Sequence, residues 1–332
     1  MTPSVLVVGA PRSGTTWVAQ ILSAAAGADY VEEPDNHFRF AFAYTAKRRL
    51  GLGPYPRLDS RESSPQAAAY ERLWREAFEP VDLPRTRVAA RSAANRLVRT
   101  AGSRRVARAL AGEARGAALR VAEAMAVPEQ AVGEGRPLVV KSVFAPLAAE
   151  WIAARHDVAT VVVLRDPLSV VSSWLALGWL DPAGPEPLAA VPDALAEELG
   201  ELFGAPCPPS SWLARTAWLI GVLTCALEAA VRRNPSWIRV VHEELYVAPH
   251  DTFPSIASAA GLAWSAAGDS ALDRANRPGK GYETTRATRD LRDSWRRRLD
   301  DRQVEEVVAA LQGLPLEHLG PRPRDVVDPR TG

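Results

Sequence analysis

The hydrophobic and polar positions of this chain alternate between short apolar runs and longer stretches with helical spacing. Apolar, β-branched runs predict buried strands at 4–8, 137–141, 158–164 and 237–241. Apolar positions recurring about every 3.6 residues predict helices, at 15–23, 70–78, 148–155, 169–177, 193–202, 210–232, 252–260 and 301–311. Strands that alternate with helices are typical of an α/β fold, so we expect a mostly parallel central sheet flanked by helices.

The segment between the first and later strands departs from this pattern. Residues 84–125 predict two helices broken near Gly102, with ten arginines and a single acid, Glu113, between Arg85 and Arg120. Three interpretations compete: a solvated helical insertion, a cap over an anionic acceptor or cofactor, and a surface for peripheral contact with an anionic membrane. Nucleic acid is not expected as a partner, because no aromatic residues interleave with the arginines.

Composition narrows the class of protein. The 332 residues carry a net charge of +1, are 47% hydrophobic and include two cysteines, which excludes a disulfide scaffold. The most apolar late stretch, 218–227, is too short to span a bilayer and is flanked by Arg215 and Glu228. No charged and apolar leader precedes the first strand, so we expect a cytoplasmic protein.

The first strand runs into a glycine-rich loop, Gly9-Ala-Pro-Arg-Ser-Gly14, followed by a helix. A strand, such a loop and a helix N-terminus form a phosphate cradle, and the spacing nearly matches the P-loop of nucleoside-triphosphate enzymes. Thr16 occupies the hydroxyl position, but Thr15 stands where those enzymes need a lysine. The loop's cation is Arg12, so we predict a P-loop-like cradle for a 5′-phosphate. The structural alternative is a tight turn without a ligand.

Other candidate residues stand at predicted strand ends, where α/β sheets place their chemistry. Glu32 and Glu33 end the extended stretch 28–34, although a solvated acidic turn would look the same. Arg165 ends a buried strand, Asp166 and Pro167 predict the start of the next helix, and Ser173 lies two turns along it. An arginine with a nearby hydroxyl could clamp a second phosphate, or Arg165 could form an ordinary ion pair.

These segments together resemble the sulfotransferases that use 3′-phosphoadenosine 5′-phosphosulfate (PAPS). The run Pro11-Arg-Ser-Gly-Thr-Thr-Trp17 is similar to that family's 5′-phosphosulfate loop, and Arg165 and Ser173 are in register with its 3′-phosphate clamp. The resemblance extends to 242–261 and to Trp295, and covers most of the chain outside 35–135. The resemblance implies that PAPS is bound by these residues: Arg12, Ser13, Gly14, Thr15, Thr16, Trp17, Arg165, Ser173 and a late basic loop with Arg277, Lys280 and Gly281, or else Arg286. Trp17 is expected to pack in the core rather than stack on adenine.

The resemblance also bears on the catalytic base. The histidine-base branch of the family carries Lys-Thr-His-x-x-Pro, whereas this chain has Val143 in place of the histidine. The carbohydrate and tyrosylprotein branches use a glutamate before proline, which implies Glu33 as base, ahead of Glu32 and His37. We expect a modestly raised pKa for that base. Arg12 and Lys141 are expected to neutralise charge on the transferred sulfuryl group, with no metal required.

The sequence therefore predicts an enzyme that moves a sulfuryl group from PAPS to a hydroxyl of a carbohydrate, lipid or secondary metabolite. One alternative is a kinase with a degenerate P-loop, and another is a non-catalytic nucleotide-binding or membrane-surface protein. We expect one domain over residues 1–320, an insertion at about 36–136 that sets acceptor specificity, and a flexible tail at 321–332.

Overall fold

The computed structural model describes residues 2–79, 83–112, 115–130, 135–180, 191, 193–208, 211–276 and 294–317. The late basic loop with Arg277, Lys280, Gly281 and Arg286 lies outside these residues, as does the tail at 321–332. The domain boundaries inferred from the sequence stay a prediction.

The centre of the described fold is a five-stranded sheet in the order β2-β3-β1-β4-β5, and every neighbouring pair is parallel. The strands are β1 (Ser4–Gly9), β2 (Asp29–Glu32), β3 (Leu138–Ser142), β4 (Ala159–Leu164) and β5 (Ile238–Val241). Each lies within one or two residues of its predicted position. β1, β3 and β4 are mostly apolar runs buried on both faces, whereas β2 and β5 at the two edges of the sheet are only partly buried. The mostly parallel α/β architecture is therefore confirmed.

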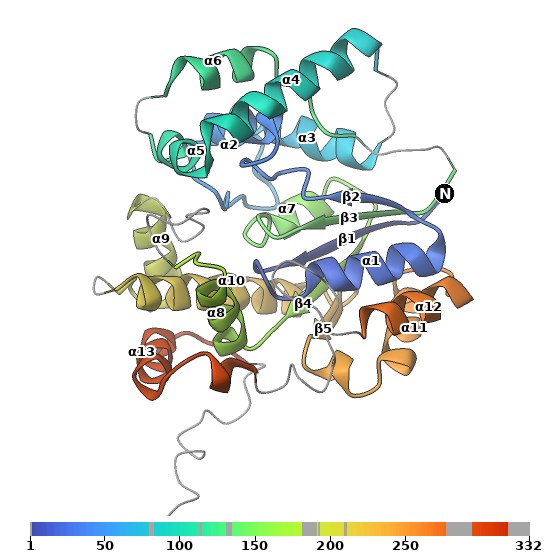
Figure 1. Ribbon diagram of the computed structural model, residues 1–332, viewed down its shortest axis with the longest axis vertical. Coiled ribbons are helices and arrows are strands. Elements are labelled where there is room, and N and C mark those ends of the chain that lie inside the picture. The colour runs from blue at the N-terminus through green and yellow to red at the C-terminus, as the bar shows by residue number, and fades with distance from the viewer. Residues whose placement is uncertain are drawn as a thin grey trace, which may run out of the picture.

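Helices cover both faces of this sheet (Figure 1). Val5 and Val7 of β1 pack against α1 (Thr15–Ala26), α11 (Pro249–Ala259) and α12 (Ala266–Ala275). Leu6 and Val8 point the other way, toward α7 (Ala149–Ala153), α3 (Ala68–Phe78) and α10 (Trp212–Arg233). Among the described residues α10 is the one helix long and apolar enough to cross a membrane, but 78% of its apolar window is buried in this core.

A further cluster lies beyond the carboxyl edge of the sheet. It includes α8 (Pro167–Ala176), α9 (Asp193–Phe203) and α13 (Asp301–Leu311), which pack around the first half of α10. The predicted start of α8 is confirmed, because the Asp166 side chain accepts a hydrogen bond from the Leu168 backbone and Pro167 is the first helical residue. Short 3₁₀ turns at Glu244–Tyr246 and Ser294–Arg297 complete the described elements.

The chain between β2 and β3 forms a separate helical layer, drawn at the top of Figure 1. It contains α2 (Ala41–Leu50), α4 (Arg85–Ala101), α5 (Ser103–Leu110) and α6 (Ala117–Ala124), together with α3. The predicted break at Gly102 is present, but the prediction of two helices over 84–125 is wrong because there are three. Gly112, at φ +93°, adopts a left-handed conformation that ends α5.

Candidate active site

The candidate residues come from the carboxyl ends of all five strands. Parallel strands end at one edge of a sheet, so residues that follow them in the chain are brought together there. Glu33 follows β2, and Lys141 is the penultimate residue of β3. Arg12 follows β1 and Arg165 follows β4. His242 follows β5, and it is a residue that the sequence argument did not assign a role.

The loop after β1 is sharply folded. Arg12 has φ +73°, and the Ser13 amide donates to the Ala10 carbonyl at 3.0 Å. Gly14, at φ +101°, directly precedes α1, and a Cβ there would lie 2.2 Å from the His242 ring. The positive φ of this position and the closeness of the His242 ring therefore both require a glycine. The Ser13 hydroxyl is buried and has no partner among the described residues.

The loop and the predicted 3′-phosphate clamp are joined directly. The Arg12 Nε donates to the Ser173 Oγ at 3.1 Å, and the Arg165 Nη1 donates to the Arg12 carbonyl at 2.9 Å. The Trp174 indole donates to the Pro11 carbonyl at 3.0 Å. Two segments about 160 residues apart in sequence thus form one hydrogen-bonded unit, here called the arginine clasp (Arg12, Arg165, Ser173).

Arg165 also contacts a carboxylate. Its Nε lies 3.9 Å from the Glu243 Oε1, and that oxygen accepts from the Asp166 backbone at 3.2 Å. Burial raises the pKa of Glu243, and Arg165 opposes this. The ion pair considered from the sequence is therefore present, at the outer limit of contact distance. It does not replace the bond from Arg165 to the loop.

His242 and Trp17 close the other side of the loop. The His242 ring lies edge-on to Trp17, with centroids 5.8 Å apart, and Trp17 packs against Phe253 at 5.1 Å. Burial together with Arg165 and Arg12 lowers the pKa of His242 well below 6.5, so the imidazole is neutral. Trp17 packs among core aromatics, as its sequence position suggested.

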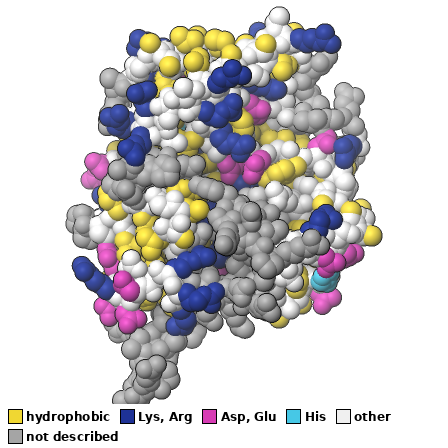
Figure 2. Space-filling view, viewed as in Figure 1, with side chains coloured by type: hydrophobic (Ala, Val, Ile, Leu, Met, Phe, Trp, Pro, Cys, Tyr) yellow, Lys and Arg dark blue, Asp and Glu magenta, His cyan; other side chains and the backbone are white. Residues whose placement is uncertain are grey.

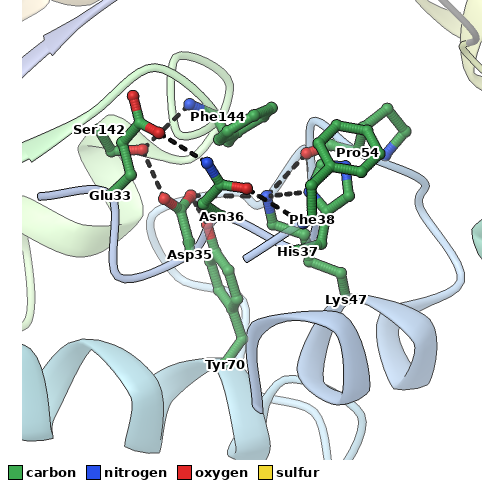
Figure 3. A network of polar contacts seen from close by, with 10 residues as sticks. All are labelled: Glu33, Asp35, Asn36, His37, Phe38, Lys47, Pro54, Tyr70, Ser142 and Phe144. Carbon is green, nitrogen blue, oxygen red and sulfur yellow. Dashed lines mark hydrogen bonds and ion pairs between the residues drawn. The ribbon is translucent and has the colours of Figure 1, made fainter. Parts of the chain in front are cut away.

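Glu33 and Lys141 form an ion pair at the ends of β2 and β3. The Lys141 Nζ donates to the Glu33 Oε1, and the Asn36 Nδ2 donates to the Glu33 Oε2 at 2.7 Å (Figure 3 shows Glu33 and Asn36). Glu33 has φ +50°, and it is with Arg12 one of two non-glycine residues of positive φ in the described chain. Such conformations cost about 1–3 kcal/mol each and cluster at functional sites.

Comparisons with known proteins identify the family. The model of the sulfotransferase family matches residues 3–191, more than half of the chain. The chain belongs to the sulfotransferase family. No curated protein sequence matches it.

Solved structures similar to this sulfotransferase are distant in sequence. The sulfotransferase domain from the curacin biosynthetic pathway is 11% identical, with coverage of 94% of this chain and 98% of that one and a TM-score of 0.44. A sulfotransferase from Mycobacterium tuberculosis H37Rv is 14% identical, with coverage of 95% and 78% and a TM-score of 0.43. The sulfotransferase domain of the Synechococcus PCC 7002 olefin synthase is 14% identical, with coverage of 93% and 94% and a TM-score of 0.36.

The family assignment decides between the functions left open by the sequence. The protein is an enzyme that transfers a sulfuryl group, so the kinase and the non-catalytic alternatives are set aside. The family match ends at residue 191, and it includes the loop after β1, the Glu33 turn, β3 and the clamp residues Arg165 and Ser173. The 5′-phosphosulfate loop, the Glu33 turn and the 3′-phosphate clamp therefore lie in the matched segment, whereas 242–261, Trp295 and the late basic loop lie beyond it.

The expected pKa of Glu33 is corrected by the structure. Burial alone would raise it, but the Lys141 charge and hydrogen bond, the Asn36 hydrogen bond and the Arg39 charge together lower it below its ordinary value. The expectation of a modestly raised pKa is therefore wrong for the ligand-free enzyme. Glu33 is an ionised carboxylate whose basicity is held down by its partner.

The two other candidate bases occupy different surroundings. Glu32 lies 3.8 Å from the Lys141 Nζ and 3.2 Å from the Arg39 guanidinium, on the partly exposed side of the turn. His37 is fully buried between Phe38 and Phe144, and burial lowers its pKa well below 6.5. In this arrangement His37 cannot reach an acceptor from solvent.

Proposed function

We propose that this sulfotransferase uses PAPS as the sulfuryl donor and a hydroxyl group as the acceptor, with Glu33 as the general base. The observation that carries the proposal is the arginine clasp. It joins a loop suited to a 5′-phosphate to an arginine and a hydroxyl suited to a 3′-phosphate, which is the pair of anionic groups that distinguishes PAPS from ATP.

The residues of the loop fit a bound phosphosulfate. Ser13 offers a buried hydroxyl that no described residue of the chain bonds, and Gly14 exposes backbone at the N-terminus of α1, where the helix dipole favours an anion. Thr15 and Thr16 follow in the first turn of α1. Arg12 supplies the cation that a phosphosulfate requires beside these neutral donors.

The proposed reaction is an in-line displacement at sulfur. Glu33 accepts the proton of the acceptor hydroxyl while the hydroxyl oxygen forms a bond to sulfur. At the same time the bond from sulfur to the 5′-phosphate oxygen breaks. The products are a sulfate ester and 3′,5′-ADP. Arg12 and Lys141 lie at the ends of adjacent strands, where their charges can offset negative charge on the sulfuryl and bridging oxygens. A metal ion is not expected in this scheme, which stays a prediction.

The acceptor is proposed to be a hydroxyl of a carbohydrate, a lipid or a secondary metabolite. The aromatic side chains beside the Glu33 turn pack against one another, with Phe38 and Phe144 centroids 6.2 Å apart and Tyr55 5.9 Å from Phe144. All three are buried, so they support the turn from the protein interior rather than line open space for an acceptor. Val143, where the other branch has its histidine, belongs to the same buried cluster.

The test is calorimetry with 3′,5′-ADP and with ATP–Mg on the full chain. We expect 3′,5′-ADP to bind at least ten times more tightly, because the arginine clasp can contact a 3′-phosphate that ATP lacks. Binding of ATP–Mg with equal or greater affinity would rule out PAPS as the donor.

We also propose a cytoplasmic enzyme whose insertion touches an anionic membrane surface. In α4 the buried residues Ala94, Asn95 and Val98 lie opposite the exposed Arg85, Arg96 and Arg99. Figure 2 shows dark blue Lys and Arg side chains over this helical layer. The largest exposed apolar side chains there are Val88 and Val121, too small to insert, so the contact would be electrostatic.

A further inference from the structure

This chain contains few lysines, and two of them are buried next to carboxylates of the same turn. Only three of the 40 basic residues are lysines: Lys47, Lys141 and Lys280. Lys47 and Lys141 are 0% and 1% exposed. Each contacts a carboxylate of one short turn, since Lys141 pairs with Glu33 and the Lys47 Nζ lies 3.6 Å from the Asp35 Oδ2.

Asp35 joins three elements of the fold. Its Oδ1 accepts from the Ser142 Oγ at 2.6 Å, and its Oδ2 accepts from the Tyr70 hydroxyl at 3.2 Å (Figure 3). With Lys47, these partners come from β3, α3 and α2. All four side chains are essentially inaccessible to solvent. The turn after β2 is therefore anchored through one carboxylate to three separate segments.

Lys47 is held as closely as Asp35. Its Nζ donates to the Pro54 carbonyl at 2.8 Å, lies 3.4 Å from the His37 Nδ1 and sits 4.6 Å from the centre of the Phe144 ring. A buried ion pair gives little net stability compared with an apolar pair of similar volume, because both charges lose their water. The presence of the Lys47–Asp35 pair is better explained by the conformation that it imposes on the turn after β2.

That geometry bears directly on Glu33 and Lys141. The Glu33 amide donates to the Lys141 carbonyl at 2.7 Å as the last rung between β2 and β3. Beyond this rung, the Asp35–Ser142 hydrogen bond continues the connection, one residue after Lys141 and two after Glu33. The Glu33 backbone is left-handed and would relax without such anchoring.

We propose that Asp35 and Lys47 are positioning residues that hold the Glu33 carboxylate against the Lys141 ammonium by fixing the turn 33–36 to the end of β3. The inference rests on the proposed function, in which Glu33 takes the acceptor proton. Neither Asp35 nor Lys47 touches the substrates. They act through the backbone of the turn and through Ser142.

The test compares Asp35→Asn, Lys47→Met and the double variant D35N/K47M. Each single variant leaves an unbalanced group in the core, so we expect a lower melting temperature and at least tenfold slower turnover. The double variant removes both charges, so the melting temperature should recover to near the wild-type value. Turnover, followed as 3′,5′-ADP released from PAPS with 4-nitrophenol, n-octanol and octyl glucoside as hydroxyl probes, should stay at least tenfold low. Recovery of both quantities would overturn the proposal.

A matched control removes an ion pair between α7 and α10. Glu150 and Arg233 pair on the surface, and the variant E150Q/R233M should change neither turnover nor 3′,5′-ADP affinity. The affinity of D35N/K47M for 3′,5′-ADP should also stay within threefold of wild type, because the arginine clasp is untouched. Loss of that affinity would instead indicate a general structural defect and would contradict the proposal.

A second readout does not depend on activity. In protein labelled with ¹⁵N only at lysine, the three Nζ signals can be assigned with K47M and Lys280→Ala. We expect the Lys141 signal to shift in D35N/K47M and to be unchanged in E150Q/R233M. An unshifted Lys141 signal would overturn the positioning role even if the enzyme is an active sulfotransferase. A shifted signal in a protein that binds no 3′,5′-ADP would instead contradict the proposed donor.

Discussion

Two regions of this sulfotransferase carry positive charge in opposite ways. Around the turn after β2, two lysines are buried and paired with carboxylates, Lys47 of α2 with Asp35 and Lys141 of β3 with Glu33. Across α4 and α5, eight arginines occur between residues 85 and 110 without a single acidic residue. Of the arginines in 85–120, Arg91 and Arg115 turn back to pair with Glu129 and Glu123, whereas Arg96 and Arg99 are exposed.

This difference indicates where the positions of charged side chains are fixed by their surroundings. A buried charge must have a partner at a defined distance, so its surroundings specify one arrangement. An exposed guanidinium is solvated and can be changed at little cost to stability. We therefore expect catalysis to depend on the buried region and interactions with large anionic surfaces to depend on the exposed one.

The largest effect is expected at Glu33. Glu33→Gln keeps the shape of the side chain and removes the base, so turnover should fall by about 10²–10⁴-fold. The affinity for 3′,5′-ADP, measured by calorimetry, should be unchanged because in the proposed mechanism the carboxylate contacts the acceptor and not the nucleotide. Glu32→Gln is the matched control, since its side chain faces the partly exposed Arg39. Equal losses in the two variants would mean that neither glutamate alone is the base.

The next effect is expected in the arginine clasp. Arg165→Ala should weaken 3′,5′-ADP by about 10–100-fold, since hydrogen bonds to charged groups contribute about 1.5–3 kcal/mol. The affinity for 5′-AMP should change much less, because 5′-AMP has no 3′-phosphate. Calorimetry with the two nucleotides makes the comparison.

Because Arg165 also supports the Arg12 carbonyl, a second variant separates binding from loop structure. Ser173→Ala removes only a hydroxyl that accepts from the Arg12 Nε, and it should affect 3′,5′-ADP in the same direction to a smaller extent. If both variants weaken the binding of 3′,5′-ADP and of 5′-AMP equally, Arg165 and Ser173 maintain the structure of the loop rather than bind a 3′-phosphate.

The strands and the residues at their ends could be predicted from sequence. The run 158–164 is apolar at every position except Thr160, which in a parallel sheet predicts both the strand and the place where it ends. Arg12, Glu33, Lys141 and Arg165 then follow from position, since parallel strands bring their ends together. His242 had the same signal, as the first residue after a predicted strand.

The buried polar turn could not be predicted in the same way. Tyr70 is 35 residues from Asp35 and Ser142 is 107, and neither separation leaves a pattern in the sequence. Lys47 stands beside Arg48 and Arg49 in what reads as an exposed basic run, yet it is fully buried while Arg49 is exposed. Its burial follows from the packing of α2 against α3, α4, α5 and α6, which is a tertiary effect. The lowered pKa of Glu33 is also a tertiary effect, because its largest lowering cause is Lys141, 108 residues away in the sequence.

The pH dependence of kcat/KM tests whether Lys141 lowers the pKa of Glu33. In the wild type, the acidic limb of kcat/KM should lie below the ordinary glutamate pKa of 4.5, because Lys141 and Asn36 outweigh burial. Lys141→Met leaves burial to dominate, so the pKa of Glu33 rises and the limb moves to higher pH. The sign follows because a protonated Glu33 cannot accept the acceptor proton.

Stability should report the same pKa independently of turnover. Since the folded state lowers the pKa of Glu33, the wild type gains stability at pH values above the ordinary carboxyl pKa and loses it as the pH falls through the lowered value. In Lys141→Met that acid-side loss should disappear from urea unfolding curves. If the free energy of unfolding depends on pH in the same way in both proteins, Lys141 does not lower the pKa of Glu33.

The smallest effect is expected on the exposed side. Arg96→Ala should leave the free energy of unfolding within about 0.5 kcal/mol of wild type, because its side chain is exposed and lies opposite the buried residues of α4. Binding to vesicles with anionic lipid should weaken about fivefold, since one arginine near such a surface contributes about 1 kcal/mol. Arg239→Ala removes the same charge from an exposed position of β5, the edge strand at the opposite end of the sheet from β2, and should leave vesicle binding unchanged. Equal losses in the two variants, or binding to uncharged vesicles, would show that net charge rather than the face of α4 governs the contact. Turnover should be the same in all three proteins, because no charge in the buried turn has changed.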